Sequence, residues 1–211
     1  MNQKISPSAV LRVLLACSLF GAAPVAAQHF EARLGVMVSS VLVHDEAATA
    51  GLARALGATV LGPTDLKLAP APAASAVMVS NLGTRTQVEV NGTFALSKLR
   101  ASNEEADWEV QDVSVASATV GVRYKRWSRV ALTAGAGATH FFTDDTGIFS
   151  EGNSLMPLVE IGAFANVPVG TVPLHAVVKL QSHTFGTPAL RREGAGEGKP
   201  VRLLVQVGFG R

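Results

Sequence analysis

The sequence lacks any unbroken apolar run of the length a membrane-spanning helix needs, about 18 residues or more. Charged residues are also scarce: they make up 16% of the 211 residues, whereas about a quarter is usual in soluble domains. Hydrophobic residues nevertheless account for 48% of the chain. The apolar content is therefore high but dispersed, and no membrane-spanning helix is predicted.

Cysteine is almost absent. The single cysteine, Cys17, lies in a segment with a basic start, an apolar core at 13–23 and small residues up to Ala27. These are the features of a secretory signal peptide, so we predict that residues 1–27 are removed and that 28–211 form the mature domain. A mature chain without a thiol cannot form disulfides. The residues before Cys17 faintly resemble a lipoprotein box, but the apolar run continues past the cysteine, which disfavours lipidation.

An excess of charge of either sign is also lacking. The predicted signal segment holds two of the 18 basic residues and none of the 16 acidic ones. The mature domain therefore has equal numbers of both, and its formal net charge is zero. Neither a basic run nor a phosphate-binding loop is present, so no nucleic-acid partner is predicted.

What the sequence does contain is alternation of apolar and polar residues. The closing stretch VRLLVQVGFG (201–210) places Val, Leu, Val, Val and Phe at every second position, and mostly polar or small residues between them. A period of two predicts a β-strand with one apolar face. Eight such segments can be marked, at 29–43, 66–81, 85–101, 110–125, 129–142, 155–168, 173–185 and 200–210.

The connections between these segments alternate in length. The short ones are 81–85, 125–129 and 168–173, and the longer ones are 44–65, 102–109, 143–154 and 186–199. Short and long connections in turn are typical of membrane barrels with tight periplasmic turns and larger external loops. We therefore predict an all-β fold: an eight-stranded antiparallel up-and-down transmembrane β-barrel, with both termini on the periplasmic side.

Two segments depart from a simple strand pattern. Pro70 and Pro72 cannot donate to a strand ladder, so we expect them at the outer end of the second strand, beyond its hydrogen-bonded part. The fourth segment changes phase at 112–114, which indicates a β-bulge.

The polar face of the strands carries glycine and charges of both signs. Glycine gains nothing on a solvent-facing strand position, but inside a narrow barrel it leaves room for long side chains. Buried charges of both signs must pair to offset their desolvation. We therefore predict that the apolar face contacts lipid and that a polar network fills the barrel interior, formed by Glu31, Arg33, Glu89, Arg123, Glu160, Lys179 and Arg202.

Aromatic residues gather at the predicted strand ends, where a membrane barrel has its interfacial girdles. The expected periplasmic girdle is Phe30, Tyr124, Trp127 and Phe209. The expected outer girdle contains Trp108 and Phe142, with Phe141 and Phe185 at the same end.

Three stretches, GVRYKRW (121–127), AGAGATHFF (134–142) and VRLLVQVGFG (201–210), together with the layout of 28–211, resemble the small eight-stranded outer-membrane barrels of the OmpA/OmpX/Opa-like group. The resemblance implies the outer membrane of a Gram-negative-type bacterium, with membrane lipid as a partner. It also implies recognition of the last strand by the assembly machinery through an aromatic residue. Phe209 resembles that residue, although Gly210 and Arg211 follow it.

No cluster of residues indicates catalysis, a cofactor or a metal. The five histidines are scattered, and metal sites need several converging ligands. Ser182 and His183 suggest the His and Ser pair of lipid A-modifying barrels, but neighbours on a strand point to opposite faces. We predict no catalytic, cofactor-binding or metal residues.

The leading functional hypothesis is a non-enzymatic outer-membrane barrel that presents four loops for envelope integrity, adhesion or surface binding. An unknown ligand would bind through loops 44–65, 143–154 and 186–199. Because eight strands leave an interior that side chains fill, a diffusion pore is disfavoured. Three alternatives stay open: a narrow OmpW-like channel or carrier for small apolar molecules, a lipid A-modifying enzyme, and a soluble periplasmic ligand-binding barrel.

Overall fold

The computed structural model describes residues 28–45, 63–104, 106–144, 146–151, 155–169, 172–192, 194 and 197–210. The predicted signal peptide and residues 46–62 of the first predicted loop lie outside the described residues.

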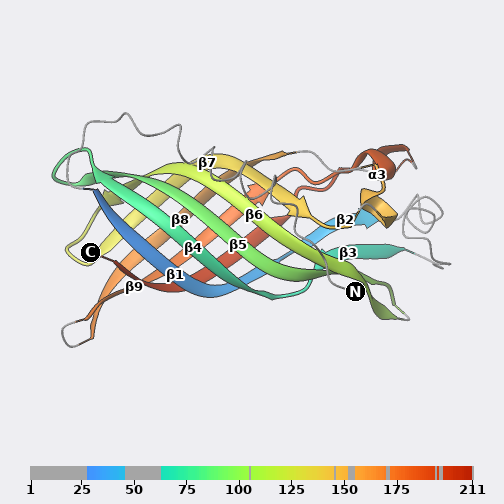
Figure 1. The fold of residues 1–211 in the computed structure, drawn as a ribbon, viewed down its shortest axis with the longest axis horizontal. Helices are drawn as coiled ribbons and strands as arrows, with labels where there is room; N and C mark the ends of the chain where they lie inside the picture. Colours follow the sequence, from blue (N-terminus) through green and yellow to red (C-terminus); the bar gives the residue numbers. More distant parts are fainter. Residues whose placement is uncertain are drawn as a thin grey trace.

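Ten antiparallel strand segments form one closed barrel (Figure 1). They are β1 (Gln28–Ser39), β2 (Val41–Asp45), β3 (Thr64–Leu68), β4 (Ala71–Asn81), β5 (Thr86–Ser102), β6 (Asp107–Lys125), β7 (Val130–Phe142), β8 (Met156–Val169), β9 (Val172–His183) and β10 (Val201–Gly210). Since β1 continues into β2 and β3 into β4, the ten segments make eight strands. Pairing of β1 with β10 and of β5 with β6 completes the ring. The predicted eight-stranded antiparallel barrel is confirmed, with strand ends within three residues of those expected.

The two ends of the barrel differ in their connections. Short turns, at 82–85, 126–129 and 170–171, join strands at one end, which we call the turn end. The opposite end, the loop end, carries three longer connections, a short 3-10 helix η1 (Gly147–Phe149) and a short helix α3 (Pro188–Arg192). The prediction of a long connection at 102–109 is wrong, because β5 runs to Ser102 and β6 begins at Asp107, which leaves a connection as short as those of the turn end. Figure 1 shows α3 at the same end as β2 and β3. Among the described residues, no helix has the length and apolar character required to cross a membrane.

The two prolines of the second strand are placed differently from each other. Pro70 separates β3 from β4, whereas Pro72 lies within β4, opposite Val36 of β1. The expectation that both prolines lie beyond the hydrogen-bonded part is therefore wrong: Pro72 is in register with β1, and Pro70 lies between two paired segments, because β3 on its outer side still pairs with β2 and β5. Register pairing with β5 is interrupted between Leu68 and Ala73, so a residue without an N–H group is tolerated there.

A bulge in β6 falls earlier than predicted. Leu99 of β5 pairs with Gln111, but Arg100 pairs with Glu109, so Val110 is the extra residue. An extra residue reverses which side chains face the interior. As a result, Trp108 and Val110 pack against the buried apolar residues instead of facing outward.

The interior is divided along the barrel axis into two layers. Toward the loop end lies an apolar layer of buried side chains, to which η1 contributes Ile148 and Phe149 and α3 contributes Leu190. Its other members are Met37, Leu42, Val43, Leu66, Leu68, Ala71, Ala73, Ala95, Leu99, Ala101, Val113, Val115, Phe141, Met156, Phe185 and Leu204. Toward the turn end, the interior is filled mainly by buried charged and polar side chains.

Candidate functional site

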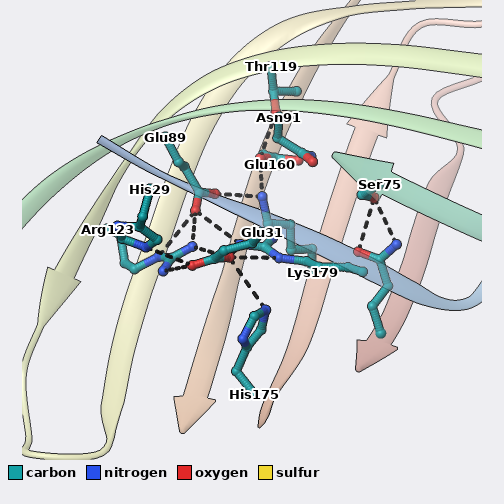
Figure 2. Close-up of polar contacts among 12 residues, drawn as sticks. His29, Glu31, Ser75, Glu89, Asn91, Thr119, Arg123, Glu160, His175 and Lys179 are labelled. Atoms are coloured by element: carbon teal, nitrogen blue, oxygen red, sulfur yellow. Dashed lines mark hydrogen bonds and ion pairs between the residues drawn. The ribbon is translucent and has the colours of Figure 1, made fainter. Parts of the chain in front are cut away.

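Six buried charged residues from five strands meet in the turn-side half of the interior, and we call them the ionic layer. They are Glu31 and Arg33 of β1, Glu89 of β5, Arg123 of β6, Glu160 of β8 and Lys179 of β9. Side chains along a strand alternate between its two faces, and each of these six residues occupies a position whose side chain faces the interior. Figure 2 shows most of this layer, with the charged groups converging from opposite walls of the barrel.

Arg123 joins two carboxylates across the interior. Its Nη1 donates to Oε1 of Glu31 at 2.8 Å, and its Nη2 donates to Oε2 of Glu89 at 2.8 Å. Arg33 donates from Nε to Oε2 of Glu31 at 3.1 Å, and its Nη2 lies 3.7 Å from Oε2 of Glu89. Each of these two carboxylates therefore lies between two guanidinium groups.

Lys179 extends the same layer to the third carboxylate. Its Nζ donates to Oε1 of Glu89 at 2.7 Å and to Oε1 of Glu160 at 2.6 Å. Thr119 donates to Oε1 of Glu160 at 2.9 Å, and Gln181 donates to its Oε2 at 2.9 Å. With three carboxylates and three cations the layer is formally neutral, and pairing offsets the cost of burying each charge.

Two glycines make room for these long side chains. A Cβ on Gly208 would lie 2.4 Å from Nε2 of His175 and 2.6 Å from Cγ of Arg33. A Cβ on Gly162 would lie 2.9 Å from Cγ of Lys179. All three distances are shorter than van der Waals contact, so glycine is required at these two positions if the side chains of His175, Arg33 and Lys179 keep their places.

An aromatic contact covers the ionic layer on its turn side. The Arg123 guanidinium carbon lies 4.0 Å from the centre of the Phe164 ring, and the His175 ring stacks on Phe164 with centroids 4.7 Å apart. His175 Nε2 also lies 3.4 Å from Oε2 of Glu31, and His29 Nε2 lies 3.3 Å from its Oε1. These contacts separate the charges from the solvent at the turn end.

Arg202 does not belong to this network, and the prediction that grouped it with the other charges is wrong on this point. It is fully buried, but its register on β10 places it opposite Ser39 and Gln181, one layer closer to the loop end. Its Nη1 donates to Thr139 at 3.2 Å, while Nε and Nη2 have no hydrogen-bond partner in the described part of the chain. No carboxylate among the described residues forms an ion pair with it. Both ring nitrogens of His183 are likewise without a partner.

A second group of buried polar residues was not predicted. Ser75 of β4 forms hydrogen bonds of 2.8 Å with Thr93 of β5 and with Nε2 of Gln206 of β10. Thr119 and Gln181, which bind Glu160, were missed as well. All of them alternate with outward apolar residues, so strand parity alone could have identified them.

The aromatic residues expected at the two membrane interfaces are distributed unevenly. At the turn end Phe30, Tyr124, Trp127 and Phe209 are all exposed on the outside of the barrel. At the loop end, only Phe142 keeps a partly outward position, with its ring edge-on to His140.

The other loop-end aromatic residues point inward. Phe141 and Phe185 are fully buried and pack edge to face with ring centroids 5.3 Å apart, and Trp108 packs against the same layer. The prediction of an outer girdle is therefore wrong for Phe141, Phe185 and Trp108. Phe141 and Phe185 occupy inward positions of β7 and of the segment after β9, and the bulge turns Trp108 inward.

The outer surface of the barrel is apolar between its two ends. Along β1 and β10 the outward positions are Phe30, Ala32, Leu34, Val36 and Val38, and Val201, Leu203, Val205, Val207 and Phe209. Large side chains such as Leu34 and Ile161 are exposed by 67% and 62%. Charged side chains thus fill the turn-side half of the interior while aliphatic ones cover the outside, the reverse of a soluble protein.

The carboxylate oxygens of the ionic layer are all paired. Each oxygen of Glu31, Glu89 and Glu160 has a cation or hydrogen-bond donor within hydrogen-bond distance. Ser182 and His183 point to opposite sides of β9, with only His183 buried. Within the described ranges, no group of three or more His, Cys, Asp or Glu side chains is placed to hold a metal ion. A hollow of about 20 Å³ lies beside Arg123 and Phe164, which is enough space for about one water molecule.

Comparisons with known proteins give structural neighbours only. No family model matches the chain, and no curated protein matches it. The outer membrane protein OprG from Pseudomonas aeruginosa is similar with 14% identity and a TM-score of 0.48, over 88% of this chain and 97% of that one. Ail, the attachment invasion locus protein of Yersinia pestis, is similar with 14% identity and a TM-score of 0.42, over 87% of this chain and 98% of that one. These values are too low to assign an activity, and the resemblance to the OmpA/OmpX/Opa-like group stays a prediction.

Proposed function

We propose that this protein is an integral outer-membrane β-barrel that acts without catalysis, by presenting its loop end outside the cell. The observation that supports this most strongly is the reversed distribution of polarity, with ion pairs inside and a continuous aliphatic surface outside. Exposed apolar patches on soluble monomers rarely exceed a few hundred Å², whereas here the outward faces of β1 and β10 are apolar along their whole lengths.

The closed barrel supports the same proposal through its backbone. A strand can cross lipid only if all its N–H and C=O groups are paired, which requires a ring without free edges. Pairing of β1 with β10 and of β5 with β6 provides that ring. Aromatic residues on the outside at the turn end, such as Trp127 and Phe209, suit the boundary between lipid and water.

The filled interior favours a structural or surface-binding role over general diffusion. The ionic layer crosses the turn-side half, and the apolar layer fills the half nearer the loops. We infer that binding, adhesion or envelope support takes place at the loop end, through loops 44–65, 143–154 and 186–199. There the exposed cation Lys98 is paired with Glu109.

The same proposal includes the assembly machinery as a partner of β10. Phe209 is exposed at the end of the last strand, where an incoming partner can contact it. Replacing it in a Phe209→Ala variant should slow membrane assembly in cells. Phe30 is also exposed, on the neighbouring strand, and Phe30→Ala should not slow assembly.

A gel comparison tests the membrane location. Protein extracted from membranes is run in SDS unheated and boiled. A closed lipid-facing barrel requires detergent for extraction, resists unheated SDS and changes mobility on boiling. Extraction without detergent, together with identical mobility, would contradict the proposal and favour the soluble periplasmic barrel.

A second candidate function is favoured by the apolar layer itself. Phe141, Phe149, Phe185 and Leu190 give the loop-side interior a lining suited to small apolar molecules. A narrow carrier would need η1 and α3 to move aside. Uptake of a small hydrocarbon into vesicles that contain the protein would support this function, and a rate equal to that of protein-free vesicles would contradict it.

The lipid A-modifying alternative would require His183 to act together with a serine from another strand, because Ser182 points away from it. The mass of lipid A after expression of the folded protein tests this alternative directly, and an unchanged mass would count against it.

A further inference from the structure

Four exposed cations at the turn end are unpaired, and we call them the basic cluster: Arg85, Lys125, Arg126 and Arg129. None of them forms an ion pair with a carboxylate in the part of the chain that the structure describes. The reason is visible in the sequence, since the turns at 82–85, 126–129 and 170–171 contain no Asp or Glu. Among the described residues, the carboxylates nearest this end, Glu31 and Glu89, are buried and already paired.

The exposed cations of the loop end behave in the opposite way. Lys98 pairs with Glu109 at 2.7 Å, and Arg100 pairs with Asp107 at 3.1 Å. Ion pairs also join Lys67 to Asp107, Arg191 to Glu197 and Arg192 to Glu151. The two ends therefore differ: five of the described loop-end cations are paired within the protein, with exposed Lys199 as the exception, while all four of the basic cluster are left for an external anion.

Backbone contacts hold the basic cluster together. The Lys125 amide donates to the Arg85 carbonyl at 2.8 Å, which joins the two turns side by side. The Asn166 amide donates to the Arg129 carbonyl at 2.8 Å, which anchors the other side of the 126–129 turn on β8. The four charges thus lie along one arc of the barrel rim, over β5 to β8.

The surroundings of the cluster indicate where its anion must lie. Trp127, exposed by 59%, lies within the cluster, and the Arg126 guanidinium carbon is 5.8 Å from the centre of its ring. Tyr124 is exposed just below, where the aliphatic outer surface begins. A ring with one apolar and one polar end prefers the boundary between lipid and water, so cations beside such rings lie at the depth of lipid head groups.

We propose that the basic cluster binds the phosphate groups of anionic phospholipids in the leaflet at the turn end. This proposal rests on the membrane location proposed above. A row of unpaired cations on a convex rim suits several head groups side by side better than one ligand in a pocket. Basic residues next to an anionic membrane surface attract it strongly, and the attraction is screened by salt.

The two tryptophans allow a direct test. The chain contains only Trp108 and Trp127, one at each end of the barrel. A Trp108→Phe variant leaves Trp127 as the single reporter within the basic cluster. Its fluorescence is measured in vesicles of phosphatidylcholine that contain a small fraction of brominated phosphatidylglycerol or of brominated phosphatidylcholine. We expect the anionic lipid to be preferred next to Trp127 by about threefold or more at low salt, and the preference to disappear near 1 M salt.

Two further variants make the result specific. In the Trp108→Phe background, replacing the four cations of the basic cluster by glutamine should reduce the preference to about one. A Trp127→Phe variant leaves only Trp108, whose ring packs against the apolar layer inside the loop end, so it gives the background signal away from the basic cluster and should show no preference between the two brominated lipids.

Equal quenching of Trp127 by the two brominated lipids would overturn the proposal and leave the membrane location intact. A preference that survives removal of the four charges would also overturn it. If neither lipid quenches Trp127, the protein has not inserted, and both the membrane location and the lipid site are wrong.

Discussion

The two halves of the barrel interior are built from the same alternating strands but are held together in different ways. In the ionic layer, a few directional contacts link distant strands, such as Arg123 of β6 to Glu31 of β1. In the apolar layer, stability comes from filling space, with Phe141, Phe149 and Phe185 in mutual ring contact. We therefore expect the stability of the ionic half to depend on charge balance, and the stability of the apolar half to depend on side-chain volume.

The largest effect is expected when the charge balance of the ionic layer is broken. Glu89→Gln leaves Arg33, Arg123 and Lys179 with two carboxylates, and breaking a buried pair typically costs about 3–5 kcal/mol. Urea unfolding in phospholipid vesicles measures this loss. Adding Lys179→Met restores neutrality, so the double variant should be more stable than Glu89→Gln alone. A double variant with the full sum of both losses would mean that charge balance does not govern this half.

A slightly smaller loss is expected from removing volume in the apolar layer. Leu99 is fully buried, and Leu99→Ala should lower the free energy of unfolding by about 3 kcal/mol. Leu96 lies on the same strand but is 59% exposed on the outside, so Leu96→Ala is the matched control and should cost less than half as much. Equal losses in the same urea experiment would indicate that the loop-side interior is not closely packed.

Arg202 lies between the two layers, and its replacement tests whether an unpaired buried charge behaves differently from a paired one. Its charge is buried and has no carboxylate partner among the described residues, so Arg202→Met should leave stability unchanged or raise it by about 1 kcal/mol. Arg123→Met is the matched substitution within the ionic layer and should be strongly destabilising. If the two variants lose the same stability, Arg202 has a partner that compensates its charge.

The smallest effect is expected outside both layers. Lys98 and Glu109 form an exposed ion pair near the loop end, and exposed pairs contribute little because solvent screens them. Glu109→Gln should therefore leave the unfolding midpoint unchanged, in contrast to Glu89→Gln on the neighbouring strand. A loss comparable to that of Glu89→Gln would mean that this rim pair is shielded from water.

Much of the fold was predictable because its signals are local. The alternation in 201–210 correctly indicates that Val205 faces outward and Gln206 inward, and the lengths of the connections predict the antiparallel order. The prediction fails where a single extra residue in a strand reverses which side chains face the interior. The extra residue Val110 turns Trp108 inward. The change of alternation at 112–114 predicted this bulge a few residues too far along the chain.

The candidate site was predictable only in part. The alternation along each strand correctly places Glu31, Glu89 and Lys179 on the inward face. It does not tell at which position along the barrel axis each side chain lies. Arg202 has the same parity as the other charges, yet it lies too close to the loop end to reach the carboxylates. The aromatic residues Phe141 and Phe185 similarly belong to the inward face, although their positions near strand ends suggested an outer girdle.

By itself, the sequence determined the number of strands, the face that each side chain takes, and the separation of charge from the aliphatic surface, because these depend on a two-residue period and on turn lengths. Only the tertiary structure decided which inward side chains meet. Glu31 and Arg123 are 92 positions apart, and Ser75 and Gln206 are 131 apart. Such contacts depend on the register of every strand between them and on closure of the ring, and neither is contained in a local pattern.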